Sequence, residues 1–492
     1  KTETAQWKAR GGEDLECLRM FAKGREQMYQ HLRFGVGDGG FQAEVATYGN
    51  IAAHYPLMYA TLFRRATGED VSSYPDATHV LPRQMMQAWF GGREPKILPL
   101  NVKASFDLNW LASNFPIVSE QWKPHVLWGW NRNLGVEVDS AEKIDRAAAE
   151  KILGQLNGQM LVRTFVNYPL EMDPKHPAEG MPKTWAAKTL GFYVFRSGWE
   201  AKDEFIAQVF TKSSPIRAWS HPNAGAFRVW GLGRPWTAAP IDRSGYRAEE
   251  SIVLMPDDVT SESGCGRVTQ YAARPDGSGA LSIDLSDVYL AVAEPKRDVV
   301  GELMDEKIED ESKRDLHMPP PKSVTDYYRE KDRDALRKKL PKLYDGWGER
   351  LASVDYKSHV DGDRAIAFDY SGKCGAPFLM VIVDRVRGGK AKQWLWHLPA
   401  GQENLSGQAK GNNFWLRYPD AQLQGTVIGP AGAKVRFLKN QEMHFIYRGG
   451  SAKGQNITRY FDFVAVETEA KDATFFVVVT IQRGEPPRVS SV

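Results

Sequence analysis

Residues 192–199 read FYVFRSGW, and this stretch marks the point at which the chain changes character. Before it, apolar residues recur at helical spacing, as over residues 46–66, where we expect one helix. After it, short apolar runs are separated by Gly, Pro, Asn and Asp, which is the pattern of antiparallel strands in a sandwich. These runs are 205–210, 227–230, 252–255, 288–292, 365–370, 378–383, 414–418 and 475–481.

This change of pattern predicts how the chain is divided into domains. Helices followed by antiparallel strands make an α+β multidomain plan. We predict an α-helical domain over residues 1–190 and an antiparallel β-sandwich domain over residues 191–492. Residues 294–342 interrupt the β pattern with a dense run of Lys, Arg, Asp and Glu. Mixed-charge runs are usually solvated, so we expect this insertion to be a helical excursion or a mobile loop.

Composition excludes several classes of protein. The 492 residues include 64 Lys and Arg against 61 Asp and Glu, which is too balanced for a nucleic-acid binder. The three cysteines are widely spaced, so the sequence indicates no paired-cysteine zinc motif and no disulfide framework. No run approaches the roughly 18 apolar residues that a membrane span needs. The sequence also lacks the motifs of nucleotide-binding proteins, zinc proteases and serine hydrolases.

The first candidate site is DGGFQAEVATY at residues 38–48, which is followed by His54. A glycine-rich turn opens a helix here, and Glu44 and Tyr48 lie four residues apart on one face of it. A tyrosine near a carboxylate or a cation can transfer a proton. The same residues also suit a capped helix with a packed tyrosine, since a buried tyrosine commonly hydrogen-bonds at its tip.

Other segments carry further candidate residues. Arg196 follows the run FYVF, and WSHPNAGAF at residues 219–227 places His221 in a polar turn before a β run. A lone histidine can be a ligand, a catalytic group or a turn residue. FLMVIVDRV at residues 378–386 and WLWH at residues 394–397 indicate two neighbouring strands, in which we expect His397 to be structural.

In this order, the segments resemble those of the heparinase II/III-like polysaccharide lyases. The family pattern begins with D-G-x-x-x-E-G-x-x-Y at a helix start in an α/α toroid. An RSGW-like strand follows, then an H-x-H-x-D-x-G-S-F segment, and later an F-L-V-V-D-R-V strand with a W-x-H turn. The resemblance covers roughly residues 35–400. It implies a partial α/α toroid followed by an antiparallel β-sandwich.

The resemblance also implies an activity, which is β-elimination on an anionic polysaccharide that contains uronic acid. A base removes the weakly acidic C5 proton while an acid protonates the departing O4, and hydrogen bonds or positive charge neutralise the carboxylate. By motif match, Tyr48 takes the proton-transfer role, and Arg196 and His221 supply the cationic surroundings. The resemblance further implies secretion or residence in the periplasm. Substrate contacts are expected from Glu44, His54, Trp219, Asn223 and Tyr246.

This sequence departs from the family pattern at several positions. The spacing from Asp38 to Glu44 is one residue longer, and Val45 replaces the glycine. In the H-x-H-x-D segment, Trp219 stands at the first histidine and Asn223 at the aspartate. These replacements leave open a second reading, a degenerate non-catalytic member that binds glycan or assembles with a partner. An (α/α) glycoside hydrolase is a weaker alternative, because it needs two carboxylates that flank the bond.

The resemblance implies a metal site as well. In zinc-binding members the middle histidine is a ligand, and here this residue is His221. Asp242 and Glu250 fall near the positions of the other two ligands. The three residues could hold zinc or another divalent metal through mixed nitrogen and oxygen ligands.

The helical stretch is short for a full toroid, because residues 1–190 supply only about seven or eight helices. We therefore expect a processed or partial chain. A separate N-terminal fragment or a partner chain would complete the toroid.

Overall fold

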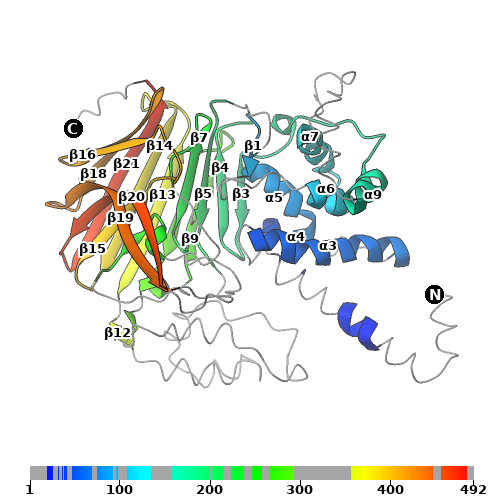
Figure 1. The fold of residues 1–492 in the computed structure, drawn as a ribbon, viewed down its shortest axis with the longest axis horizontal. Helices are drawn as coiled ribbons and strands as arrows, with labels where there is room; N and C mark the ends of the chain where they lie inside the picture. Colours follow the sequence, from blue (N-terminus) through cyan, green and yellow to red (C-terminus); the bar gives the residue numbers. More distant parts are fainter. Residues whose placement is uncertain are drawn as a thin grey trace.

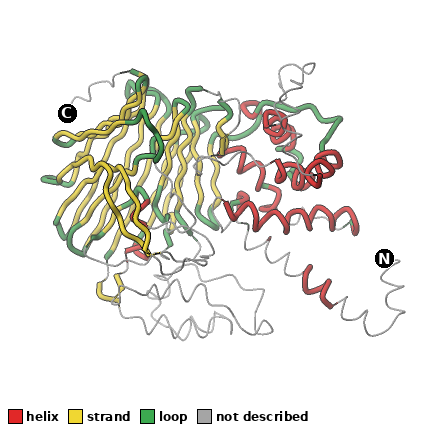
Figure 2. Tube along the Cα trace, in the orientation of Figure 1, coloured by secondary structure: helices red, strands yellow, loops and turns green. Residues whose placement is uncertain are grey.

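The computed structural model places the helices at one end of the molecule and the β-sheets at the other (Figures 1 and 2). It describes residues 19–25, 32, 36, 38–41, 47–68, 75–91, 96–97, 108–133, 158–199, 202–213, 223–237, 247–256, 265–289, 291–292, 356–358, 360–446 and 456–484. The predicted α+β multidomain fold with a β-sandwich is confirmed. The predicted charged insertion lies outside the described residues.

The helical part packs around a core of its own. The predicted helix over 46–66 is confirmed as α3, which contacts α6, and α6 in turn contacts α9. The helices are α3 (Thr47–Thr67), α4 (Pro75–Thr78), α5 (Val80–Gln87), α6 (Leu108–Asn114), α7 (Lys123–Asn133) and α9 (Gly158–Asn167). Shorter elements are the 3-10 turns η2 (Asp38–Gly40), η4 (Phe115–Ile117) and η5 (Pro177–Glu179), and the paired strands β1 (Ala88–Trp89) and β2 (Lys96–Ile97).

A five-stranded antiparallel sheet forms the middle layer. Its strands follow one another as β3 (Thr184–Ala187), β4 (Phe192–Arg196), β5 (Phe205–Phe210), β6 (Phe227–Gly231) and β7 (Arg234–Pro235). Successive side chains of a strand point to opposite faces. Phe192 and Val194 therefore pack into the helical core, whereas Tyr193 and Phe195 pack into the sandwich core. Burial on both faces explains why the β4 sequence is a continuous apolar run.

The second layer is an eight-stranded antiparallel sheet. Its strand order is β16-β17-β18-β21-β14-β13-β10-β9. Phe205 stacks on Phe378 of this sheet with ring centroids 5.1 Å apart, so the two sheets pack face to face. The bounds are β9 (Arg267–Ala273), β10 (Gly279–Asp284), β13 (Asp361–Asp369), β14 (Phe378–Arg387), β16 (Ser406–Lys410), β17 (Asn413–Tyr418), β18 (Ala421–Gly429) and β21 (Asp472–Arg483).

A four-stranded sheet of order β19-β20-β15-β8 completes the sandwich. Its strands are β8 (Val253–Leu254), β15 (Lys392–His397), β19 (Lys434–Ile446) and β20 (Asn456–Thr468). The remaining elements are the 3-10 turns η6 (Arg247–Glu249) and η7 (Ser286–Tyr289), and the paired strands β11 (Ala291–Val292) and β12 (Tyr356–Ser358). Of the strand predicted over 288–292, residues 288–289 therefore belong to a 3-10 turn and residues 291–292 to β11.

The boundary predicted at residue 190 falls in the turn between β3 and β4. Since β3 pairs with β4, the β part of the fold begins with β3, before that boundary. Within the part of the chain that the structure describes, no helix is long and apolar enough to cross a membrane.

Candidate functional site

The glycine-rich turn Asp38–Gly40 is fixed against the first hairpin of the five-stranded sheet. The Asp38 carboxylate accepts a hydrogen bond from Thr189 N at 2.5 Å, and Trp185 Nε1 donates to the Gly39 carbonyl at 2.8 Å. Gly40 has φ of +73°, and a Cβ there would lie 2.3 Å from the carbonyl carbon of His79. Only glycine accommodates both this backbone conformation and this close approach. The turn ends at Gly40, and α3 begins at Thr47 with Tyr48 as its second residue.

His79 is a titratable residue at this turn that the sequence did not single out. Its imidazole packs edge-on against Trp185, with ring centroids 5.6 Å apart. Burial lowers the pKa of His79, and the nearby negative charge of Asp38 opposes that shift only in part. The imidazole is therefore mostly uncharged at neutral pH, where it can either donate or accept a hydrogen bond.

The turn is braced from its other side by Arg83, a buried residue of α5. Arg83 Nε donates to the Gly40 carbonyl at 3.2 Å, and the guanidinium lies 5.7 Å from the centre of the Phe41 ring. Burial lowers the pKa of Arg83 to about 9, which leaves the side chain charged at neutral pH. Phe41 in turn stacks on Phe192 of β4, with centroids 4.4 Å apart. The turn is thus joined both to the helices and to the sheet.

Arg196 ties the end of α5 to the sheet. Its side chain is fully buried, and Nη2 contacts Glu204 Oε2 at 2.7 Å. Its Nε donates to the Gly198 carbonyl at 2.8 Å, and the guanidinium lies 3.4 Å from the ring centre of Trp199. Nη1 faces the backbone carbonyls at the end of α5, at 3.1 Å from Met85, 3.3 Å from Met86 and 3.4 Å from Ala88.

These contacts explain the RSGW stretch in structural terms. The last carbonyls of a helix have no partner within the helix, and a cation suits the negative end of its dipole. Arg196 supplies both a donor and a charge, while Ser197 Oγ accepts from Phe205 N at 2.9 Å and closes the strand end. Arg196 is therefore placed where it holds elements together, and its side chain does not reach the surface.

A second arginine joins the motif segments of the sandwich. Arg364 of β13 is fully buried and binds both carboxylate oxygens of Asp384, at 2.5 and 2.9 Å. Its Nη1 also donates to the carbonyls of Gly225, at 2.6 Å, and Ser251, at 2.9 Å. Ser251 Oγ accepts from the backbone N of His397 at 3.1 Å. Two motif segments that are distant in sequence thus meet at one guanidinium, and Ser251 links it to a third, which holds His397.

His397 itself is buried between aromatic rings. Its imidazole lies 5.5 Å from the Phe461 ring and 5.1 Å from the Phe463 ring, centre to centre. Burial lowers the pKa of His397 to about 3, and the positive charge of Arg228 adds to that shift. The side chain is neutral in the folded protein at neutral pH, which agrees with the structural role expected for it.

Glu250 was predicted as a metal ligand and Asn223 as a substrate contact, and the structure describes the side chains of both. Both are buried. Glu250 Oε2 forms an ion pair with Arg228 of β6, and burial raises the pKa of Glu250 against the pull of that arginine. The Asn223 carbonyl accepts from Ala226 N at 2.8 Å, which closes the turn that leads into β6.

For the remaining predicted site residues, the structure describes either the backbone alone or nothing. The backbone of Tyr48 and His54 belongs to α3, and nothing is described of their side chains. Glu44, Trp219, His221, Asp242 and Tyr246 lie outside the described residues. The described residues that lie near Trp219, His221, Asp242 and Tyr246 in sequence include Asn223, Gly225 and Ser251.

Glu250, the one predicted metal ligand that the structure describes, is occupied by another partner. Glu250 is already neutralised by Arg228, and a metal there would bring two more positive charges next to a buried guanidinium. Among the described residues, no three His, Cys, Asp or Glu side chains lie close enough together to hold a metal ion. His221 and Asp242 stay predicted ligands that this structure does not describe.

Comparison with known proteins adds a likeness of fold. No family model and no curated protein sequence matches the chain. Among solved structures, the chain is similar to a mutant of heparan sulfate lyase HepC from Pedobacter heparinus, with 12% identity and a TM-score of 0.51. It is also similar to heparinase III, with 9% identity and a TM-score of 0.55. The chain shares the fold of these lyases.

The likeness extends over nearly all of this chain but over only part of the other chains. The two matches cover 94% and 93% of the chain described here. They cover 56% and 57% of the lyase chains, so this chain spans little more than half the length of the structures it matches.

Proposed function

We propose that this chain is part of a polysaccharide lyase that cleaves a uronic-acid-containing polysaccharide by β-elimination. The observation that carries the proposal is the convergence at Arg364. Gly225 and Asp384, from two different motif segments, bind the same guanidinium, and Ser251, which also binds it, accepts a hydrogen bond from the backbone of His397 in a third. Three of the segments from which the resemblance was drawn therefore lie together in the fold. The likeness of fold to heparan sulfate lyases supports the same reading.

In the proposed reaction, Tyr48 transfers the protons. As the phenolate, Tyr48 takes the C5 proton of the uronate, the C5–H electron pair forms the C4–C5 double bond, and the C4–O4 bond breaks. Tyr48, now a phenol, gives that proton to the departing O4 and returns to the phenolate, so the products are an unsaturated uronate and a free hydroxyl end. A tyrosine of ordinary pKa, near 10, needs cationic surroundings to act as a base at neutral pH. We propose His221 for that role.

Arg196 receives a different role in this proposal from the catalytic one predicted from the sequence. Its donors are taken up by Glu204, Gly198 and the end of α5, and its side chain is fully buried. It cannot contact a substrate carboxylate without leaving those partners. We propose Arg196 as a positioning residue that holds the end of α5, whose Arg83 braces the turn before Tyr48.

A second function is favoured by a specific observation. Asn223 and Glu250 stand at motif positions where the resemblance predicts contacts or ligands, yet both are buried, and Glu250 is paired with Arg228. A non-catalytic protein of the same fold, which binds glycan or assembles with a partner, would show this loss of exposed site residues. Binding of uronate polymers without turnover would favour it.

The wider context belongs to the same proposal. The partner molecule is an anionic polysaccharide, and the protein acts outside the cytoplasm, either secreted or in the periplasm. A further segment, in the same chain or in a partner, supplies the rest of the helical domain.

A panel of uronate polymers tests the reaction class directly. Each polymer is incubated with the protein, and the ultraviolet absorbance of an unsaturated uronate is followed. We expect absorbance to grow with at least one polymer. Absence of growth with every polymer, together with measurable binding to one of them, would replace the lyase with the second function.

A further inference from the structure

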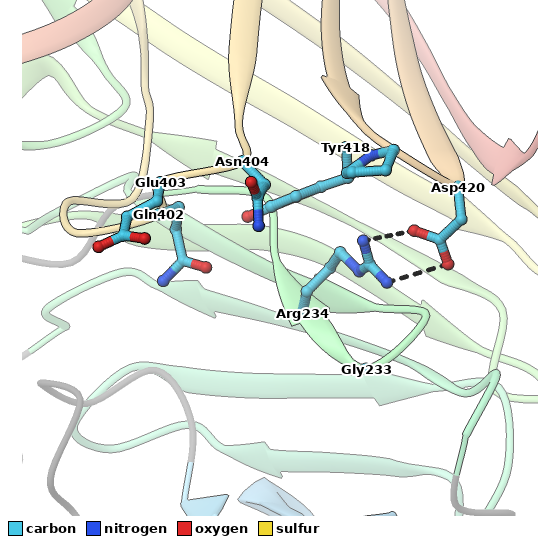
Figure 3. Close-up of a pocket in the computed structure, with 8 residues that line it drawn as sticks. Gly233, Arg234, Gln402, Glu403, Asn404, Tyr418 and Asp420 are labelled. Atoms are coloured by element: carbon cyan, nitrogen blue, oxygen red, sulfur yellow. Dashed lines mark hydrogen bonds and ion pairs between the residues drawn. The ribbon is translucent and has the colours of Figure 1, made fainter.

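Three turns from different parts of the sandwich line an open pocket of about 480 Å³ (Figure 3). This volume is within the range of small-molecule sites, which is about 300–1,000 Å³. One turn joins β6 to β7 and contributes Gly233 and Arg234. The second precedes β16 and contributes Gln402, Glu403 and Asn404. The third joins β17 to β18 and contributes residues 418–420.

One side of the pocket, which we call the floor, is formed by Arg234, Tyr418 and Asp420, and its charges are paired. Arg234 binds both carboxylate oxygens of Asp420, at 2.6 and 3.1 Å, and its guanidinium lies 4.7 Å from the centre of the Tyr418 ring. The Tyr418 hydroxyl donates to the Pro235 carbonyl at 2.9 Å. Arg483 also binds Asp420, at 2.7 Å. Arg234, Tyr418 and Asp420 therefore each have a hydrogen-bond or ion-pair partner within the protein.

The turn that carries Arg234 is strained. Leu232 and Gly233 have φ of +56° and +79°, which is a two-residue hairpin turn of type I′. A leucine at positive φ is uncommon and costs on the order of a few RT, and such strain gathers at functional sites. The Leu232 side chain is buried in the sandwich core, which holds the turn in place.

The other side of the pocket, which we call the rim, differs from the floor because its polar side chains have no partners among the described residues. Gln402, Glu403 and Asn404 are consecutive, and among the described residues their side chains have no hydrogen-bond or ion-pair partner. Glu403 and Asn404 are exposed, and Gln402 is half-buried. The amides of Gln402 and Asn404 offer both donors and acceptors, and the Glu403 carboxylate offers acceptors, so these planar groups can bind neighbouring hydroxyl groups in pairs.

The charges select among ligands. Asp420 cannot bind a metal ion freely, since two arginines occupy its carboxylate. The charged residues of the lining are Arg234, Glu403 and Asp420, and Arg483 adds its charge at Asp420. Both arginines are already paired with carboxylates, so neither offers an unpaired positive charge to a carboxylate or sulfate ligand. A neutral ligand with several hydroxyl groups suits this pocket, because the charges of Arg234 and Asp420 are already paired and the amides of Gln402 and Asn404 can still form hydrogen bonds.

We propose that this pocket binds a neutral sugar ring, with Gln402 and Asn404 as its hydrogen-bonding residues. Gly233 also faces the helical part, since a Cβ there would lie 3.6 Å from Trp89. The pocket would hold a neutral sugar unit beside the junction of the two parts. The inference is independent of the proposed elimination, because it requires binding and no bond cleavage.

Isothermal titration calorimetry with defined sugars tests the proposal on the full chain. The probes are glucose, N-acetylglucosamine and cellotriose, with glucuronate as the anionic comparison. The variants are Gln402→Ala, Asn404→Ala and the two combined. Gln408→Ala is the matched control, since Gln408 is an exposed glutamine of β16 outside the pocket. Thermal unfolding of every variant confirms that the fold is retained.

We expect at least one neutral probe to bind, and the double variant to bind it at least about tenfold more weakly, as the loss of two hydrogen bonds implies. Gln408→Ala should bind like the parent. Binding that survives the double variant, preference for glucuronate, or no neutral binding up to tens of millimolar would each overturn the proposal. A lyase-inactive chain that still binds would refute only the elimination.

Discussion

Replacing Arg196 by methionine tests the junction of the helical part and the sheet. Methionine keeps an unbranched side chain against Trp199 but removes the charge and every donor. Glu204, which is nine-tenths or more buried, then loses its counter-charge, and the end of α5 loses its donor. Breaking a buried pair in this way typically costs about 3–5 kcal/mol of unfolding free energy. We expect a loss of that size for Arg196→Met.

Two further variants show whether the loss of stability comes from the buried ion pair. Arg385→Met is the matched control, because Arg385 pairs with Asp363 at 3.1 Å with its side chain 52% exposed, and such pairs contribute only about 0–1 kcal/mol. Adding Glu204→Gln to Arg196→Met removes the orphaned charge, so the double variant should be more stable than Arg196→Met alone. Urea unfolding followed by circular dichroism and tryptophan fluorescence measures all of these variants.

Hydrogen exchange localises the effect. The amides of α5 should exchange faster in Arg196→Met than in the parent, because the anchored end of the helix is released. If Arg196→Met cost no more than Arg385→Met, or if α5 exchanged at the parent rate, the junction role of Arg196 would be wrong.

Two other changes follow from the geometry. Gly40→Ala should destabilise the protein by about 1–3 kcal/mol more than Gly411→Ala. Both glycines have positive φ, but only at Gly40 would a Cβ collide with a neighbour, the backbone of His79. Equal unfolding midpoints for the two variants would contradict the close packing of the turn. His397→Leu should make the free energy of unfolding depend less on pH between pH 7 and pH 5 than it does in the parent. Burial holds the pKa of His397 at about 3, so below its ordinary value of 6.5 the unfolded chain binds more protons, and the parent loses about 2 kcal/mol between pH 7 and pH 5 from this group. Unfolding curves at both pH values measure the difference, and parallel losses in parent and variant would exclude His397 as the cause.

Strands with strong apolar patterns could be predicted from the sequence. FYVF became β4 and FLMVIVDRV became β14, because burial on one or both faces leaves a clear apolar signal. β9 and β19 were not predicted, since their exposed or half-buried residues dilute that signal. The region around 288 was misread because Val288 and Tyr289 are buried in a 3-10 turn, and an apolar run alone does not distinguish such a turn from a strand.

The site was harder to predict than the fold, because its decisive contacts are long-range. Arg196 looked like a cation available to a substrate, but its partners include carbonyls more than a hundred residues away in sequence. Glu250 fitted a ligand position by spacing, and only the fold shows that Arg228 faces it. His79 carried no motif at all. Its place at the site follows from the close approach of Gly40, which no local pattern encodes.

The central claim is that Tyr48 transfers protons in a β-elimination. The most direct measurement is the rate at which Tyr48→Phe produces an unsaturated uronate from the best polymer of the panel, with Tyr59→Phe, on the same helix α3, as the control. Since positioned proton transfer contributes about 10²–10⁴-fold, the account predicts that Tyr48→Phe loses at least about a hundredfold in rate while Tyr59→Phe retains it. A folded Tyr48→Phe variant with the parent rate would contradict the account.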